Sequence, residues 1–312
     1  MARIIVTGGA GFIGSVLVNR LMKDYSSYFD ALVVVDKLTY AANLENLEET
    51  SKSKKFRLEV ADLVNFQEID SLIQDNDQIF HLAAESHVDN SISSGGVFWQ
   101  TNTLATANIL EIMKNRKGVR LLYISTDEVY GSIDEGSFSE LSPLNPSSPY
   151  SASKAGGDLA CLAYLKTHNL DLNVTRCCNN FGIEQHPEKL LPVLIRNVNA
   201  HQPVPIYGDG KNVREWIPAW AHAEYLIRLM FSNIRGEVFN IGSGLELNNL
   251  ETASMVASVL QKELRVNFVE DRKAHDFRYS VDYSKIKRAL GILTYDPLEE
   301  LARTIHNFAG LR

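Results

Sequence analysis

Short apolar runs, many of them rich in β-branched residues, alternate with amphipathic stretches through the first half of the chain. Several runs are apolar on both faces, as buried parallel strands are, and the stretches between them have the period of helices. The alternation predicts right-handed crossovers and a doubly wound parallel α/β sheet. The predicted strands span 3–7, 31–35, 56–60, 78–82, 120–125, 172–177 and 237–241, and the predicted helices span 12–23, 66–74, 98–117 and 150–168.

The pattern loosens after about residue 178. There we predict helices over 190–200, 250–262 and 283–290, and short strands over 265–269 and 278–281. No Gly/Ser-rich linker separates the halves, so the second should pack closely on the first. We therefore predict one domain over residues 1–177, to which the chain returns around 215–242, and a smaller C-terminal α/β lobe over 178–312.

The composition is that of an ordinary globular protein, with 45% hydrophobic and 22% charged residues. A net charge of −7 without a dense basic run argues against a nucleic-acid partner. The longest uninterrupted apolar run is far shorter than the roughly 18 residues of a membrane helix. Three cysteines, of which Cys177 and Cys178 are adjacent, form neither a disulfide framework nor a metal-ligand pattern. We expect a cytoplasmic protein with no metal site and no membrane contact.

A glycine-rich segment from Gly8 to Gly14 follows the first strand and opens the first helix. Its glycines allow a tight turn and close approach of the backbone, and a helix N-terminus favours a pyrophosphate. Asp36 ends the next strand, where a carboxylate accepts bonds from a ribose 2′-hydroxyl and repels a 2′-phosphate. The segment predicts a Rossmann-like domain that binds NAD rather than NADP. Asp62, after the third strand, suits the adenine edge, although a helix N-cap explains it equally well.

A second segment combines a tyrosine, a lysine and two carboxyl groups. Tyr150 and Lys154 are four residues apart, so they lie one above the other on a helix face. A neighbouring ammonium favours the phenolate, so we expect Lys154 to lower the pKa of Tyr150 and make it a general base. Thr126 could orient the hydroxyl that loses its proton. Asp127 and Glu128 add two carboxyls, which different environments can divide into an acid and a base.

These residues carry a resemblance that covers nearly the whole chain. The glycine segment with Tyr150-x-x-x-Lys154 resembles the extended short-chain dehydrogenase/reductase family. Within it, the chain is similar to nucleotide-sugar 4,6-dehydratases of the dTDP-glucose branch, closest to those of actinomycete deoxysugar and antibiotic pathways. The pair Asp127-Glu128 is the most discriminating detail, because epimerases of the family typically lack it. The motifs that carry the finer resemblance lie at 36–41, 81–89, 125–131, 149–154, 176–182, 186–190 and 206–214.

The resemblance implies an internal redox cycle on dTDP-glucose. Tyr150 removes the proton of the C4 hydroxyl while a hydride passes from C4 to NAD⁺. The new ketone acidifies C5, so Glu128 removes that proton and Asp127 protonates the departing C6 hydroxyl as water. The hydride then returns to C6 and a proton to C5, which leaves dTDP-4-keto-6-deoxyglucose and unchanged NAD.

The resemblance also implies the contacts of both ligands. The expected cofactor contacts are Gly8, Gly11, Phe12, Ile13, Gly14, Asp36, Lys37, Leu38, Thr39, Asp62, Leu63, Leu82, Ala83, Ala84, Thr101, Tyr150, Lys154 and Asn180. The expected substrate contacts are Ser86, Thr126, Asn179, Glu188, Lys189, Leu190, Pro205, Tyr207, Arg214, Asn249, Arg272, His275 and Tyr279. His81 and His87 are expected to be structural residues. By analogy with the family, we expect a homodimer that pairs the helices at 98–117 and 150–168 into a four-helix bundle.

Two alternatives and one departure accompany the resemblance. The same chemistry on another nucleotide sugar, such as a UDP-sugar, and a catalytically silent NAD-binding regulatory protein are the competing functions. The presence of Tyr150, Lys154, Asp127 and Glu128 argues against the silent protein. The departure lies at 218–221, where Trp220-Ala221 replaces the acidic pair that is usual in the family, and we expect a lost helix N-cap or domain contact there.

Overall fold

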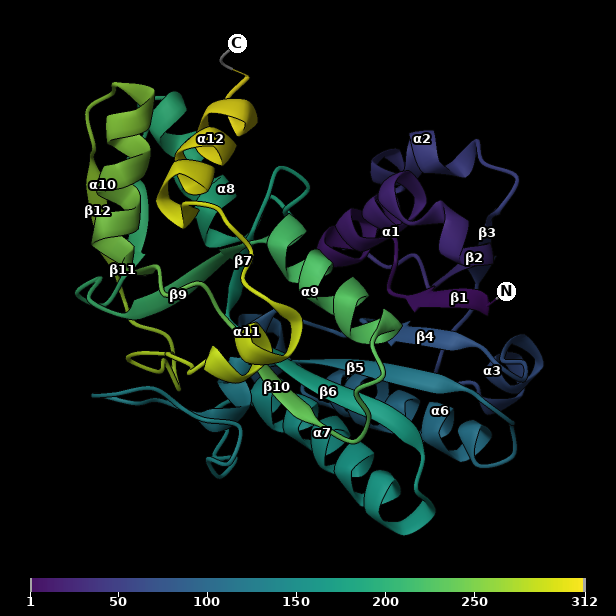
Figure 1. Ribbon diagram of the computed structural model, residues 1–312. Coiled ribbons are helices and arrows are strands. Elements are labelled where there is room, and N and C mark those ends of the chain that lie inside the picture. Colours follow the sequence, from purple (N-terminus) through teal and green to yellow (C-terminus); the bar gives the residue numbers. More distant parts are fainter. Residues whose placement is uncertain (1, 311–312) are drawn as a thin grey trace.

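The computed structural model describes residues 2–310 and contains one large parallel sheet. All its neighbouring strands pair in parallel, in the order β10-β6-β5-β4-β1-β2-β3. The predicted doubly wound, Rossmann-like α/β fold is confirmed (Figure 1). The strands are β1 (Ala2–Thr7), β2 (Phe29–Asp36), β3 (Phe56–Val60), β4 (Gln78–His81), β5 (Arg120–Thr126), β6 (Asp171–Cys177) and β10 (Val238–Ile241).

Helices cover both faces of this sheet, because successive strand side chains point to opposite faces. Ile4 and Val6 of β1 face a core shared with α1 (Phe12–Asp24) and α9 (Ala219–Phe231). Ile5 faces the other core, shared with helices α3, α6 and α7. Helix α2 (Glu48–Ser51) lies beside α1. The other helices of this domain are α3 (Phe66–Leu72), α4 (Val88–Ser93), α5 (Gly96–Phe98), α6 (Ala105–Met113) and α7 (Pro149–His168). Short 3-10 turns span Ser26–Tyr28, Leu44–Leu47 and Asp127–Tyr130.

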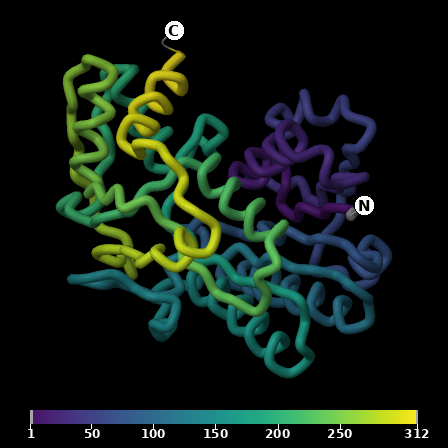
Figure 2. Tube along the Cα trace, in the orientation of Figure 1, coloured from purple at the N-terminus to yellow at the C-terminus, as the bar shows by residue number. Residues whose placement is uncertain are grey.

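The C-terminal lobe has a separate core between two small sheets and three helices. Figure 2 shows the green and yellow C-terminal third, which forms most of this lobe but also runs back beside the large sheet. One small sheet has the order β11-β9-β7 and the other pairs β12 with β8 in parallel. The elements are β7 (Asn179–Phe181), α8 (Leu190–Asn199), β8 (Val204–Tyr207), β9 (Val213–Pro218), β11 (Glu246–Asn248), α10 (Asn249–Leu260), β12 (Val266–Val269) and α12 (Pro297–Phe308). Helix α11 (Ser284–Leu290) instead packs beside β10 and α9 of the large-sheet domain.

The structure corrects several element predictions. Residues 278–281 form isolated bridges from Arg278 and Val281 rather than the predicted strand, because their partners are single residues of other segments. The helix predicted over 98–117 ends at Met113 and includes a π-helical turn, Trp99–Leu104. Helices α9 and α12 were not predicted, although Asp296 caps α12 by accepting from the amides of Leu298 and Glu299.

The departure at 218–221 has a definite structural outcome. Pro218 is the N-cap of α9, no side chain caps that helix end, and the first turn of the helix holds no acidic residue. Trp220, however, makes contacts between domains. Its indole donates to Glu300 of α12 at 3.1 Å, and the guanidinium of Arg20 in α1 lies 5.7 Å from its ring. The tryptophan thus joins the first helix of the sheet domain to the last described helix of the lobe.

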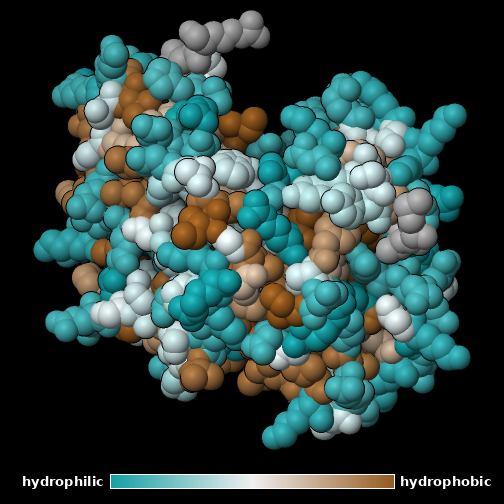
Figure 3. Space-filling view, in the orientation of Figure 1, coloured by the Kyte–Doolittle hydropathy of each residue, from teal (hydrophilic) through white to brown (hydrophobic). Residues whose placement is uncertain are grey.

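No helix of the described residues is long and apolar enough to cross a bilayer. The face seen in Figure 3 is mainly hydrophilic, with apolar residues scattered in small groups.

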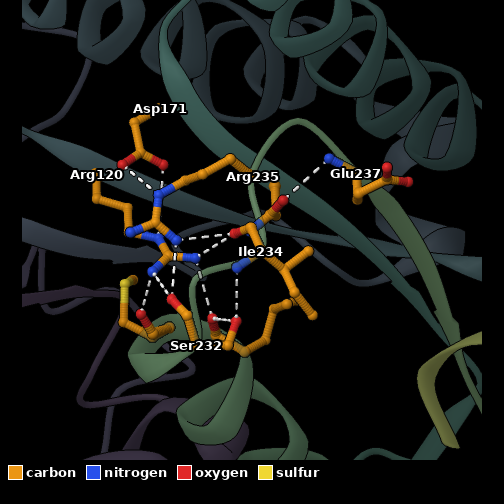
Figure 4. A network of polar contacts seen from close by, with 9 residues as sticks. Arg120, Asp171, Ser232, Ile234, Arg235 and Glu237 are labelled. Carbon is orange, nitrogen blue, oxygen red and sulfur yellow. Dashed lines mark hydrogen bonds and ion pairs between the residues drawn. The ribbon is translucent and has the colours of Figure 1, made fainter. Parts of the chain in front are cut away.

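Arg120 fixes the segment that returns from α9 to the large sheet (Figure 4). It is 5% exposed, and burial lowers the pKa of its guanidinium to about 10. The last carbonyl groups of a helix have no partners within the helix. A cation there also interacts favourably with the negative, C-terminal end of the helix dipole. Arg120 donates to the carbonyls of Leu229, Met230, Ser232 and Ile234.

Replacing Arg120 with Met should lower the free energy of unfolding by about 2–4 kcal/mol, because four carbonyls at the end of α9 and in the return segment each lose a charged donor. Arg235 is the matched control, since it also donates to the carbonyls of Ser232 and Ile234 but is 41% exposed. Arg235→Met should cost no more than about 1 kcal/mol. Urea unfolding of both variants measures the difference, and equal losses would contradict this account.

Candidate functional site

The loop between β1 and α1 takes a form that requires glycine. Gly8 has a φ of +70°, and a Cβ atom there would lie 2.7 Å from the Cα of Ala83. A Cβ on Gly14 would lie 2.1 Å from the carbonyl oxygen of Gly8. No side chain caps the first turn of α1, whose N-cap is Gly11. The open helix end and the close backbone packing fit the pyrophosphate of a dinucleotide.

Asp36 ties this loop to the end of β2. Its carboxylate accepts from the amides of Ala10 at 3.0 Å and Leu38 at 2.9 Å, and it still lines the adjoining cavity. Leu38 has a φ of +56° and packs against the core around α1. Its side chain therefore packs against this core rather than lining the cavity.

A cavity of about 340 Å³ runs along the carboxyl ends of the large sheet. Asp62 forms an ion pair with Lys37 at 2.5 Å on its wall, while Asn65 occupies the N-cap position of α3, so Asp62 is not that cap. Every predicted cofactor contact except Leu38 lines this cavity: Gly8, Gly11, Phe12, Ile13, Gly14, Asp36, Lys37, Thr39, Asp62, Leu63, Leu82, Ala83, Ala84, Thr101, Tyr150, Lys154 and Asn180.

Tyr150 and Lys154 come from the first turns of α7. Ser148 and Ser151 form a capping box and Pro149 begins the helix, which sets where the tyrosine faces the cavity. The Nζ of Lys154 donates to the carbonyl of Ile124 at 2.7 Å and lies 4.5 Å from the ring of Tyr123. These contacts hold α7 against β5.

The predicted direction of the Tyr150 pKa is wrong. Burial raises this pKa, and the charges of Glu128 and Asp127 raise it further, whereas a hydrogen bond with Thr126 lowers it. The ammonium of Lys154 is directed toward β5, and burial lowers its pKa to about 8. The phenol is therefore neutral in this arrangement, and additional positive charge is needed to ionise it.

Asp127 and Glu128 follow β5 and sit in different surroundings. Asp127 is 2% exposed, and its Oδ2 has no hydrogen-bond partner. Burial raises its pKa well above the usual range, and the charge of Glu128 adds to the effect. Burial also raises the pKa of Glu128, but Arg214, Lys189 and Arg272 oppose the rise. Cations oppose the rise of the pKa at Glu128 but not at Asp127, so Asp127 holds its proton more firmly, and the pair divides into an acid and a base.

A second cavity, of about 290 Å³, meets the first at Glu128, Asn179 and Lys189. It lies mainly against the C-terminal lobe. Thr126 lines the first cavity, and all other predicted substrate contacts line the second: Ser86, Asn179, Glu188, Lys189, Leu190, Pro205, Tyr207, Arg214, Asn249, Arg272, His275 and Tyr279.

Three cations give the second cavity a positive wall. Arg214 donates to backbone carbonyls and lies 4.4 Å from the ring of Tyr279. The Nε of Arg272 is buried without a partner, and Lys189 donates to the carbonyl of Ser86 at 3.0 Å. The forked donors of guanidinium groups suit a diphosphate. Asp89 is the nearest acidic partner of Arg272, at 3.7 Å.

Unpartnered polar groups gather around the two cavities. Such atoms are costly to bury unless a ligand satisfies them. They belong to His87, Ser125, Asp127, Asn179, Gln185, Trp216, His222 and Arg272, all of which line a cavity.

Several residues that line the two cavities were not predicted from the sequence. His81 is structural as predicted, since its ring bonds Thr7 and Thr106 and burial lowers its pKa to about 3. His87, by contrast, lines both cavities. Its place at the carboxyl end of β4 was the available signal. Tyr40, Gln185, His186 and His222 also line the first cavity. Tyr40 and His186 lie in motifs of the resemblance that assigned them no role, and Gln185 and His222 lie in none.

Comparison with known proteins agrees with this geometry. A family model described as GDP-mannose 4,6 dehydratase matches residues 5–305. The chain belongs to this family of nucleotide-sugar dehydratases. A dTDP-glucose 4,6-dehydratase of Streptomyces niveus is 44% identical over 292 residues, which cover 93% of this chain and 87% of that protein.

Solved structures of the family have the same fold. The dTDP-glucose 4,6-dehydratase DesIV of Streptomyces venezuelae, solved with NAD and dTDP, superposes with a TM-score of 0.93 at 44% identity and covers 97% of this chain and 96% of that one. A UDP-glucuronic acid 4-epimerase of Bacillus cereus has a TM-score of 0.90 at 26% identity and covers 99% of both chains. The fold is thus common to dehydratases and epimerases, and the side chains of the site must separate them.

Gly8→Ala should abolish NAD binding, because its Cβ would collide with the backbone of Ala83 at a positive φ. Gly96→Ala is the matched control, since a Cβ atom there meets nothing within 4 Å and Gly96 lines neither cavity. Isothermal titration with NAD⁺ measures both affinities, and thermal melting checks that each variant is folded. A Gly8→Ala variant that is folded and binds NAD⁺ like the Gly96→Ala variant would refute this role.

Proposed function

We propose that the protein is an NAD-dependent lyase that converts dTDP-glucose to dTDP-4-keto-6-deoxyglucose and water. The observation that carries the proposal is the pair Asp127-Glu128, one buried and protonated and the other beside three cations, at the junction of the two cavities. Oxidation at C4 alone needs only the Tyr150, Lys154 and Thr126 set. Elimination of water needs one further acid and one further base, and this pair supplies them.

Tyr150 acts first by taking the proton of the C4 hydroxyl, which Thr126 orients. When bound, NAD⁺ supplies the acceptor of the C4 hydride, the donor of that hydride to C6 at the end, and a positive charge in the cavity that the phenol lines. That charge favours the phenolate, which the buried site otherwise disfavours. Lys154, held by the carbonyl of Ile124, keeps a second positive charge in the same region.

Glu128 and Asp127 then carry out the elimination. The C4 ketone acidifies the C5 proton, which Glu128 removes. Asp127 gives its proton to the C6 hydroxyl, which leaves as water. Glu128 returns a proton to C5 when the hydride reaches C6, so it ends the cycle as a carboxylate again. Asp127 has lost one proton and Tyr150 has gained one, and transfer from Tyr150 to Asp127, directly or through solvent, restores both groups.

The second cavity supports a nucleoside diphosphate sugar as substrate. Arg214 and Arg272 suit the two phosphates, and Lys189 lines the same cavity. The dTDP-glucose branch is favoured over the UDP-sugar alternative by its relatives at about 44% identity. The silent regulatory protein is disfavoured by the complete set of acid and base groups.

The domain division stays a proposal: an NAD-binding Rossmann domain over 1–177, a return to it around 215–242, and a mainly substrate-binding lobe over 178–312. Its support is that α9 packs against α1 and that β10 pairs with β6. A cytoplasmic location likewise remains a prediction from the sequence.

The function is tested by incubating the purified protein with dTDP-glucose, UDP-glucose and GDP-mannose and following the products by NMR. A 4-keto-6-deoxy sugar should form fastest from dTDP-glucose. Preference for UDP-glucose would favour the alternative substrate, and no product from any of the three would refute the lyase assignment.

Glu128→Gln should lower turnover by about 10²–10⁴-fold, because the base for the C5 proton is lost. The first oxidation should still occur, so the absorbance of reduced NAD should rise and persist in stopped-flow measurements. Tyr150→Phe is the contrasting variant and should give no such absorbance. Normal dehydration by Glu128→Gln would show that another group removes the C5 proton.

We also propose a homodimer built from α5, α6 and α7. Its support is the group of exposed apolar side chains on α7 and on the π-helical turn that joins α5 to α6, with Leu159 at 55% on α7 and Trp99 at 47% and Leu104 at 45% on the turn. Exposed apolar clusters of this kind mark interfaces. The double variant Leu104→Glu/Leu159→Glu should be monomeric by light scattering, whereas Leu298→Glu, at a 46% exposed position of α12, should leave the dimer intact. A monomeric unmodified protein would refute the proposal.

A further inference from the structure

Two loops from different domains meet at the rim of the first cavity. Tyr40 lies in the loop after β2, and His186 lies in the loop between β7 and α8. Their rings are 5.7 Å apart between centroids and nearly perpendicular, at 89°. Both residues line the cavity, yet Tyr40 is 50% exposed and the His186 side chain 27% exposed. A contact that faces the cavity on one side and solvent on the other lies at its mouth.

Each loop is anchored before it reaches this contact. In the first, Leu38 packs into the core, the Leu38 amide bonds Asp36, and the amide of Asn43 donates to the carbonyl of Ala10. The apex at Tyr40 is thus held on both sides. The ring of Tyr40 also lies beside Glu85 and Asn90, in the segment that follows β4.

The second loop is held across the cavity to the same segment. Lys189 donates to the carbonyl of Ser86 at 3.0 Å, and Glu188 lies 3.8 Å from the ring of His87. Within the loop, the amide of Lys189 bonds the carbonyl of His186. Three chain segments therefore converge over the mouth, and the contact between Tyr40 and His186 is where the sheet domain and the lobe loop close on each other.

We propose that Tyr40 and His186 form a clasp that retains NAD in its cavity between turnovers. This inference rests on the proposed cofactor. A cycle that returns its hydride gains nothing from releasing the cofactor, so a slow exit is compatible with rapid turnover. An edge-to-face aromatic pair modestly stabilises the closed arrangement of the two loops. NAD can leave the cavity through this mouth only when the contact between the two rings is broken. Interactions of this kind are expressed mainly in the dissociation rate.

The experiment measures NAD release and does not depend on catalysis. The protein is loaded with NAD⁺, unbound cofactor is removed by gel filtration, and the NAD retained is followed by chromatography over time. Tyr40→Ala and His186→Ala should each release NAD about three- to tenfold faster than the unmodified protein. His186→Phe is the matched control and should stay within about twofold, because it keeps an aromatic edge at the same place.

The double variant Tyr40→Ala/His186→Ala decides whether the two residues act through each other. It should release NAD no faster than the faster single variant, because either single substitution already removes the contact between the two rings. Wild-type release rates in both single variants, or rate increases that multiply in the double variant, would overturn the clasp. If the unmodified protein retains no NAD⁺ at all, the cofactor assignment itself fails, which is a different result.

Discussion

Two adjacent carboxyl groups buried at the end of β5 cannot both carry a charge without compensation, and the rest of the site is arranged around that constraint. Asp127 is enclosed by the sheet domain and keeps its proton, while Glu128 faces three cations at the junction of the cavities. All three cations come from the C-terminal lobe. The difference between the acid and the base therefore exists only when the lobe is packed against the sheet.

That packing depends on the segment between the two lobes. Helix α9 belongs to the core beneath β1, and Arg120 fixes its end and the return to β10. Trp220 adds a contact from α9 to both α1 and α12, at the position where this chain departs from the usual family pattern. At this position the first turn of α9 has no acidic residue, and Trp220 links the two domains.

The sequence predicted the sheet and most of the cofactor wall because buried parallel strands and glycine turns leave local signals. Gly8, Gly14 and Asp36 are constrained by their immediate neighbours, and their roles follow from spacing. The pKa of Tyr150 could not be predicted in this way, since it depends on burial and on where Lys154 directs its ammonium. Arg278 to Val281 has the composition of a strand but lies against single residues of other segments. The contact of Tyr40 with His186 joins residues far apart in the chain, which no local pattern indicates.

The central claim is that one site oxidises C4, eliminates water and returns the same hydride to C6. dTDP-glucose labelled with deuterium at C4 tests this most directly, with the product examined by NMR and mass spectrometry. The account predicts that the deuterium appears at C6 of the 4-keto-6-deoxy sugar. Loss of the label to solvent, or a dehydrated product that carries no deuterium at C6, would contradict it.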